Sequence, residues 1–205
     1  MGLEAAQEGQ ANQLIEEAIA AHRKGDELTA IANLTVALTQ GESRTARLLR
    51  AHILAGMGQW NEAAADAEAV LAHEPDTPDA ALLLAATRSA QGQNLQATDT
   101  LLSLLKAHPD CRPAILMLGR LYLEEGRADL ALALYDRAIA DMPTFAEAYH
   151  ARGGVKHRLH DEAGAAEDLR RALQLNPSLA QDFDGTYSLL DSNGTHTHAN
   201  CLRGR

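Results

Sequence analysis

The sequence predicts an all-α protein built from a repeated pair of helices. Hydrophobic residues make up 46% of the chain but aromatic residues only 3%, so the core must consist mainly of Ala and Leu. Both are strong helix formers, whereas the aromatic and β-branched residues that favour strands are scarce. Four prolines then follow one another at intervals of 34 residues: Pro75, Pro109, Pro143 and Pro177.

Other residue types recur at the same interval. The glycine series is Gly58, Gly92 and Gly126, with His160 in the fourth place, and the alanine series is Ala63, Ala97, Ala131 and Ala165. Two further series are Ala67, Leu101, Tyr135, Leu169 and Val70, Leu104, Ala138, Ala172. Five series in one register indicate a structural repeat of 34 residues.

The order of these residues within a repeat has a mechanical meaning. Each repeat has room for two helices of about 14 residues, each about 21 Å long. Glycine ends the first helix, because it adopts positive φ without a steric penalty. The alanine five residues later lets the paired helices approach closely. Proline ends the second helix, because it has no backbone N–H to continue the hydrogen bonding.

Capping residues agree with this division. Ser43 and Asp110 stand at junctions before first helices. Thr77 is followed by Pro78, at the favoured first helical position. Thr144 has Glu147 three residues later, which predicts a capping box.

Two repeats carry the fullest set of these residues. Repeat 146–179 has Gly153, Ala165, Leu169, Ala172 and Pro177, and repeat 112–145 has Leu118, Gly119, Tyr122, Ala131, Tyr135, Ala138 and Pro143. In length and in the order of small and large residues, both resemble tetratricopeptide repeats. Repeats 44–77 and 78–111 fit less fully, with Ala51 and Ala85 where that family most often has Gly. The resemblance implies a right-handed α-solenoid whose inner surface is lined mainly by first helices.

The chain is therefore divided along the repeat register. Residues 11–43 are predicted as a degenerate leading repeat, one residue short and with Glu42 in place of the proline. About five helix-turn-helix repeats are thus expected, followed by a capping helix on whose apolar face Leu179, Phe183, Tyr187 and Leu190 fall. The predicted segments are an N-terminal extension 1–10, the repeats 11–43, 44–77, 78–111, 112–145 and 146–179, the capping helix 180–191 and a disordered tail 192–205.

The charge and hydropathy of the sequence exclude some classes of partner and indicate a cellular location. The formal net charge is −10, which disfavours nucleic acid and anionic lipid as partners. The apolar runs are shorter than the roughly 20 residues of a membrane span, and the N-terminus lacks the layout of a signal peptide. A cytoplasmic protein is expected, although a leader removed before residue 1 would leave no trace.

The resemblance places a binding groove on the first helices. Its residues are predicted at the fifth, sixth, ninth, twelfth and thirteenth positions: Ile15, Leu48, Leu49, His52, Leu82, Leu116, Met117, Arg120, Leu123, His150, His157 and Arg158. The Lys and Asn set with which some family members clamp an acidic C-terminal peptide is absent. The middle of the groove is aliphatic instead, and its far end is basic and rich in His. The alternative for the fifth and above all the sixth positions is packing against the preceding repeat.

These observations favour a protein–protein interaction module: an adaptor, scaffold or small chaperone that binds an apolar or amphipathic peptide. The alternative is a homo-oligomeric scaffold that uses the solenoid ends or outer faces. A remote third hypothesis is a metal-dependent regulator using His196, His198 and Cys201, which lack a fourth ligand. The sequence has no nucleophile motif or phosphate loop, so no enzyme, catalytic residue, cofactor or metal is predicted. Cys111 and Cys201 are expected to be free thiols.

Overall fold

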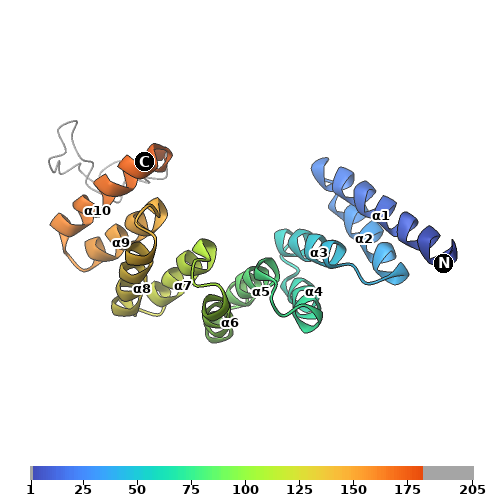
Figure 1. Cartoon of the computed structure of the whole chain (residues 1–205), viewed down its shortest axis with the longest axis horizontal. Coiled ribbons are helices and arrows are strands. Elements are labelled where there is room, and N and C mark those ends of the chain that lie inside the picture. Colours follow the sequence, from blue (N-terminus) through green and yellow to red (C-terminus); the bar gives the residue numbers. More distant parts are fainter. Residues whose placement is uncertain (1, 182–205) are drawn as a thin grey trace, which may run out of the picture. The chain divides into compact units, whose positions relative to one another are not determined.

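The computed structural model describes residues 2–181, which form ten α-helices and one short 3-10 helix without any strand (Figure 1). The predicted all-α helical-repeat solenoid is thereby confirmed. The helices are α1 Gly2–Arg23, α2 Glu27–Gln40, α3 Arg44–Gly56, α4 Trp60–His73, α5 Pro78–Ala90, α6 Asn94–Ala107, α7 Arg112–Glu124, α8 Ala128–Asp141, α9 Ala146–Arg158, α10 Glu162–Leu175 and η1 Pro177–Gln181.

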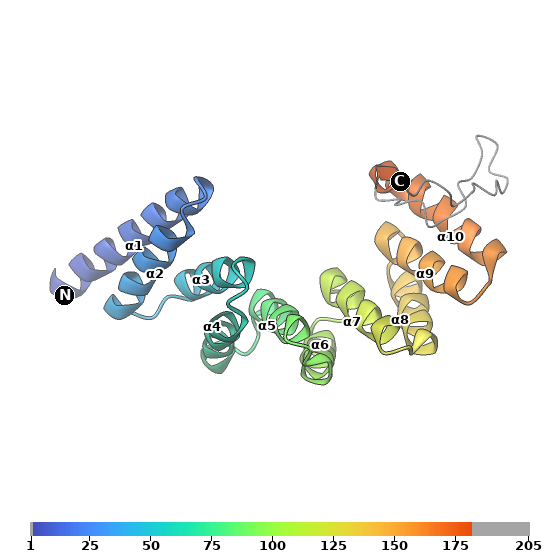
Figure 2. The ribbon, with the colours of Figure 1, turned by 180° about the vertical axis from the view of Figure 1, so that it is seen from behind.

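The chain divides into two compact parts, an N-terminal half (residues 1–107) and a C-terminal half (residues 108–205). Within each half, every helix packs against the next one along the chain (Figures 1 and 2). In addition, α3 contacts α5 in the N-terminal half, and α7 contacts α9 in the C-terminal half. Helices α3 and α5, and helices α7 and α9, are first helices of successive repeats, and each of these two pairs is in direct contact.

The turns and helix ends follow the predicted prolines and glycines. Helices α4, α6, α8 and α10 each end two residues before the proline of their repeat. The turns between paired helices contain a residue with positive φ, between +73° and +77° at the four glycines and +63° at His160. His160 thus adopts the same left-handed conformation as the glycines, although its Cβ makes that conformation costly.

Two of the four predicted caps are observed. Ser43 Oγ accepts a hydrogen bond from the Ala46 amide at 3.2 Å, and Thr77 precedes Pro78 at the start of α5. The predicted capping box at Thr144 is wrong, because Phe145 is the N-cap of α9 and makes no side-chain capping bond. Phe145 is buried, and the guanidinium of Arg112 lies over its ring. Burial of this ring fixes the start of α9 in preference to the local capping signal.

The predicted cap at Asp110 is also wrong by one residue. Cys111 is the N-cap of α7, and its side chain makes no capping hydrogen bond. Pro113 occupies the first turn of this helix, where the missing N–H costs nothing.

The core runs between the paired helices. All four members of the predicted alanine series are at most 5% exposed. The large residues that follow them one turn later, Leu101, Tyr135 and Leu169, are equally buried. Each large residue contributes roughly 1.5–3 kcal/mol by leaving water.

The two ends of the described residues can be compared with the predicted terminal segments. Helix α1 begins at Gly2, so the predicted N-terminal extension continues directly into the first helix. The last described element is η1, a 3-10 helix. The rest of the predicted capping helix and the predicted tail lie outside the described residues. No helix within residues 2–181 has both the length and the apolar character needed to cross a membrane.

Candidate partner-binding surface

The fifth-position residues of the N-terminal half fall into two classes. Leu48 on α3 and Leu82 on α5 are half-buried, and their helices contact each other. Ile15 on α1, by contrast, is only 8% exposed and belongs to the core cluster that also contains Leu34 of α2. The assignment of Ile15 to a groove is therefore corrected: its side chain fills the leading helix pair.

Two sixth-position residues of the N-terminal half, Leu49 and Leu83, pack against the preceding repeat. Leu49 lies against the cluster that α1 and α2 form with Ala46 and Ile53 of α3, and Leu83 lies against the cluster around Ala51 and Leu54. Packing between repeats, the alternative considered for this position, thus accounts for Leu49. The fifth position lies about 100° further round the helix from that contact, and Leu48 and Leu82 are half-buried.

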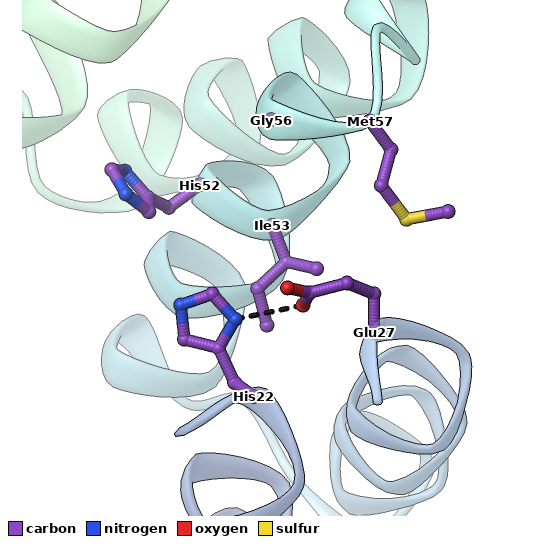
Figure 3. Close-up of a pocket in the computed structure, with 6 residues that line it drawn as sticks. All are labelled: His22, Glu27, His52, Ile53, Gly56 and Met57. Carbon is purple, nitrogen blue, oxygen red and sulfur yellow. Dashed lines mark hydrogen bonds and ion pairs between the residues drawn. The ribbon is translucent and has the colours of Figure 1, made fainter. Parts of the chain in front are cut away.

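A pocket opens beside His52 in the N-terminal half (Figure 3). It is lined by His22, Glu27, His52, Ile53, Gly56 and Met57. The Nδ1 atom of His22 lies 2.7 Å from Glu27 Oε2, which fixes this imidazole at the edge of the pocket. The pocket volume is about 160 Å³, below the roughly 300–1,000 Å³ of small-molecule sites, so it suits a single side chain better than a cofactor.

In the C-terminal half the predicted residues lie on α7 and α9. Leu116, Met117 and Leu123 on α7 are half-buried. Arg120, on the same helix, is exposed, and its Nε lies 3.6 Å from Glu124 Oε1. This cation is therefore balanced by a neighbouring carboxylate, which lowers the positive potential expected at this end.

The predicted residues of α9 are arranged around the following turn. His150 is half-buried, whereas Arg158 is exposed. The Nδ1 atom of His157 lies 2.9 Å from Glu162 Oε2, the same arrangement as that of His22 and Glu27. Both turns share the pattern His-Arg-x-x-Asp-Glu, which links the first and last described repeats.

A set of arginine bridges was missed by the sequence analysis. Arg50 of α3 donates to both carboxylate oxygens of Asp66 on α4 at 2.7 Å, and to Thr35 Oγ1 on α2 at 3.0 Å. Arg152 of α9 likewise donates to Asp168 on α10 at 2.7 and 2.5 Å, and to Asp136 on α8 at 2.7 Å.

A third bridge starts from an arginine that lies one helical turn further along its own first helix than Arg50 and Arg152 do. Arg88 of α5 donates to Glu68 on α4 at 2.9 Å and to Thr100 on α6 at 2.6 Å. Each arginine thus joins the second helix of its own repeat to the second helix of the preceding one. The signal was available, because Arg50 and Arg152 stand three repeat lengths apart, as do Asp66 and Asp168.

Hydrogen bonding in the Arg152 bridge stabilises the charged form of this arginine. Hydrogen bonds to Asp168, and further ones to Asp136, raise the pKa of Arg152 above its already high ordinary value. Asp66 and Asp168 are only 4% and 3% exposed, and each has a second cation nearby, Arg47 and Lys156 respectively. Fully paired groups of this kind support packing and are poorly suited to proton transfer.

Metal binding has little support among residues 2–181. No group of three or more His, Cys, Asp or Glu side chains is placed there to hold an ion. The predicted remote site of His196, His198 and Cys201 lies outside the described residues.

The sequence profile of the tetratricopeptide repeat family matches residues 54–120 and 90–153. Protein O-mannosyl-transferase TMTC1 of Mus musculus is 30% identical over 142 residues, which make up 67% of this chain. The chain spans only 15% of the length of that relative.

Solved structures of other proteins share the fold. MamA from Desulfovibrio magneticus RS-1 has a TM-score of 0.69 at 19% identity, covering 82% of this chain and 96% of that chain. A thermophilic tetratricopeptide-repeat protein of Thermus thermophilus has a TM-score of 0.63 at 19% identity, covering 83% and 94%. A tetratricopeptide repeat protein of Parabacteroides merdae ATCC 43184 has a TM-score of 0.72 at 16% identity, covering 82% and 68%.

Proposed function

Because this chain belongs to the tetratricopeptide-repeat family, we propose that it is a protein–protein interaction module that holds an apolar or amphipathic peptide against its first helices. One observation carries the proposal. Leu48 and Leu82 lie half-buried on two touching helices, beside Leu49 and Leu83, which are also half-buried and pack against hydrophobic clusters of the preceding repeat. Covering the exposed part of the two fifth-position side chains would contribute about 25 cal/mol for each Å² removed from water.

Polar groups beside these leucines would orient the peptide. His52 is exposed on α3 one turn after Leu48, and it shares its pocket with His22 and Glu27. The imidazole pair and the carboxylate offer both donors and acceptors to peptide groups, so that a side chain in the pocket fixes the register of an apolar segment beside it.

The C-terminal half offers a second surface of the same chemistry. Leu116 and Met117 lie half-buried on α7 beside the exposed Arg120. The thioether of Met117 is flexible and polarizable, which suits contact with side chains of varied shape. The transferase activity named for the mouse relative is not part of this proposal, because the chain spans only a small part of that protein.

The test compares two double variants of equal charge. Leu48→Glu with Leu82→Glu places carboxylates on the proposed surface, whereas Leu28→Glu with Leu95→Glu places them on second-helix leucines that are 73% and 70% exposed. A peptide is first selected from a random displayed library on the purified chain, and its Kd is measured by fluorescence anisotropy for each variant.

We expect the selected peptide to contain apolar residues and the Leu48/Leu82 variant to weaken binding at least about tenfold, with binding by the control variant unchanged. Circular dichroism confirms that both variants keep the helical content of the wild type. A folded Leu48/Leu82 variant that binds as tightly as the wild type would overturn the proposal. Leu116→Glu tests the surface of the C-terminal half in the same assay.

A further inference from the structure

The pocket beside His52 has an apolar wall and a polar wall (Figure 3). The apolar wall comes from α3 and the turn after it, where Ile53 is buried and Met57 is exposed. Gly56 adds no side chain there, and a Cβ atom at this position would meet no atom within 4 Å. This wall can therefore contact an aliphatic chain, and Gly56 leaves space beside it.

The polar wall presents hydrogen-bond acceptors. The Nδ1 atom of His22 lies 2.7 Å from Glu27 Oε2, and it must donate in this pair because a carboxylate only accepts. In a neutral imidazole the other ring nitrogen, Nε2, is then an acceptor, and it points away from Glu27 in Figure 3. Within residues 2–181 no second side chain hydrogen-bonds the Glu27 carboxylate, so its remaining acceptor sites face the pocket without a protein donor.

The pocket is negatively charged when its two imidazoles are neutral. Of the six described residues that line it, only Glu27 then carries a charge. The surrounding half is acidic too, with 14 acidic and seven basic residues at positions 1–107. Arg23 and Lys24 follow His22 in the chain, but they are exposed and do not line the pocket, so water screens their charges. The electrostatic potential of the pocket therefore favours a cation over an anion.

Partial burial of Glu27 favours a charged donor over a neutral one. The Glu27 side chain is 31% exposed, so its carboxylate has lost part of its water. A hydroxyl group would donate a hydrogen bond without balancing the charge. An ammonium or guanidinium group does both, and such charge-assisted hydrogen bonds are about twice as strong as neutral ones. Lysine and arginine also carry an aliphatic stem, which the apolar wall can contact.

We propose that this pocket binds the side chain of a lysine or arginine in the partner peptide, an inference that rests on the function proposed above. The ammonium or guanidinium group donates hydrogen bonds to the Glu27 carboxylate and to Nε2 of His22. The stem of the same side chain lies along Ile53 and Met57. The partner is thereby specified as an apolar segment with a basic residue beside it.

The position of the pocket predicts where the basic residue stands in the peptide. The pocket lies between the leading helix pair and α3, whereas Leu82 belongs to α5, which contacts α3. Leu48 stands on α3 one helical turn before His52. We therefore expect the basic residue at the end of the apolar segment that is nearer to Leu48. Packed helices are about 8–10 Å apart, so apolar residues on Leu48 and Leu82 should be about three residues apart in an extended peptide.

Peptides selected on the wild-type chain from the random displayed library are the probe. Their sequences are expected to show lysine or arginine at one end of the apolar segment. The tightest such peptide is compared with a copy that has norleucine in place of the basic residue. Kd is measured at about pH 8, where histidine side chains are ordinarily neutral. We expect the norleucine peptide to bind the wild type at least about tenfold more weakly.

Glu27→Gln removes the charge of the pocket but keeps the size of the side chain. It should weaken binding of the basic peptide at least about tenfold and change binding of the norleucine peptide less than about twofold, because the two changes remove the same interaction. Glu62→Gln is the matched control, since Glu62 also lies in the first turn of a second helix but is exposed outside the pocket. Glu27→Lys should reverse the preference, so that a peptide with glutamate in place of the basic residue binds more tightly than the basic peptide.

Two results would overturn this inference and leave the proposed function in place. The first is a set of selected peptides that depend on Leu48 and Leu82 but show no enrichment of basic residues, or show acidic ones instead. The second is equal binding of the basic peptide by the wild type and by a Glu27→Gln variant whose circular dichroism shows an unchanged helical content. Peptide binding that does not depend on Leu48 and Leu82, or no selected peptide at all, would instead overturn the proposed function, and this inference with it.

Discussion

Arg50 donates two hydrogen bonds to Asp66, with Nε–Oδ2 and Nη2–Oδ1 distances of 2.7 Å each. The carboxylate is 4% exposed and belongs to the second helix of the same repeat. A buried carboxylate is tolerated only when a cation and hydrogen bonds replace its water. The same geometry recurs at the same places of the repeat in Arg152 and Asp168, three repeat lengths away, whereas Leu84 and Leu118 take the place of the arginine in the two repeats between them.

Removing Arg50 takes away the main cation that compensates the buried carboxylate of Asp66. Arg50→Met is expected to lower the free energy of unfolding by about 3 kcal/mol, the low end for a broken buried pair, because Arg47 remains 3.5 Å from Asp66. Urea unfolding followed by fluorescence of Trp60, the single tryptophan, reports on this repeat. Adding Asp66→Leu should recover most of the loss.

The control is Arg44→Met, which breaks an exposed pair with Glu74 of equal length, 2.7 Å. Its expected cost is below about 1 kcal/mol, because water already solvates both groups. Equal losses in Arg44→Met and Arg50→Met would contradict the role given to burial.

Gly119 and Tyr135 form a size-matched pair between α7 and α8. A Cβ atom added at Gly119 would meet the hydroxyl and ring of Tyr135. Gly119→Ala is therefore expected to destabilise the chain by about 1–3 kcal/mol in urea unfolding. The preceding repeat solves the same packing with Ala85 and Leu101, both fully buried.

The residue pair of the preceding repeat suggests a second substitution that compensates for Gly119→Ala. Gly119→Ala with Tyr135→Leu copies the Ala85–Leu101 pair and should be more stable than Gly119→Ala alone. Thermodynamic additivity of the two single changes would show that the two residues do not meet as described.

Burial of Tyr135 makes stability depend on alkaline pH. Desolvation raises its pKa from 10.0 to about 12. Between these values the unfolded chain releases a proton that the folded chain retains, so stability falls as pH rises, by at most about 1.4 kcal/mol per pH unit. Unfolding free energies measured from pH 9 to 12 should show this decline, and Tyr135→Phe should lessen it. An unchanged slope in that variant would refute the assignment.

His160 carries the positive φ that glycine provides in four other turns. His160→Gly is expected to raise the unfolding free energy by about 0.5–1 kcal/mol, because relief of the left-handed strain exceeds the added entropy of the unfolded chain. Gly126→Ala is the reciprocal control, since a Cβ there meets no atom within 4 Å and only the backbone conformation is penalised. Opposite signs for the two changes are the expected result.

The local part of the fold was predictable from the sequence. Pro75 and its equivalents mark the ends of second helices, and Gly58 and its equivalents mark the turns, because both residue types act on the backbone at their own position. The capping box at Thr144 failed for the opposite reason. Phe145 is anchored by contacts with distant residues, which a four-residue motif cannot report.

The candidate site was predictable only by position along the helices. The repeat register placed Leu48 and Leu82 on touching first helices, but it treated Ile15 as their equivalent. Ile15 is buried because the leading helix pair uses it in its own core. Exposure depends on what each neighbour contributes, and that varies between repeats of one register.

The sequence by itself determined the repeat, its two helices and the turns between them, because proline, glycine and alanine impose their effects within a few residues. The tertiary structure alone decided that Leu49 and Leu83 pack against clusters of the preceding repeat. It also decided that arginines on α3, α5 and α9 join the second helices on either side of them. These outcomes depend on distances between residues about 15 to 35 positions apart in the chain, which packing fixes and local propensity does not.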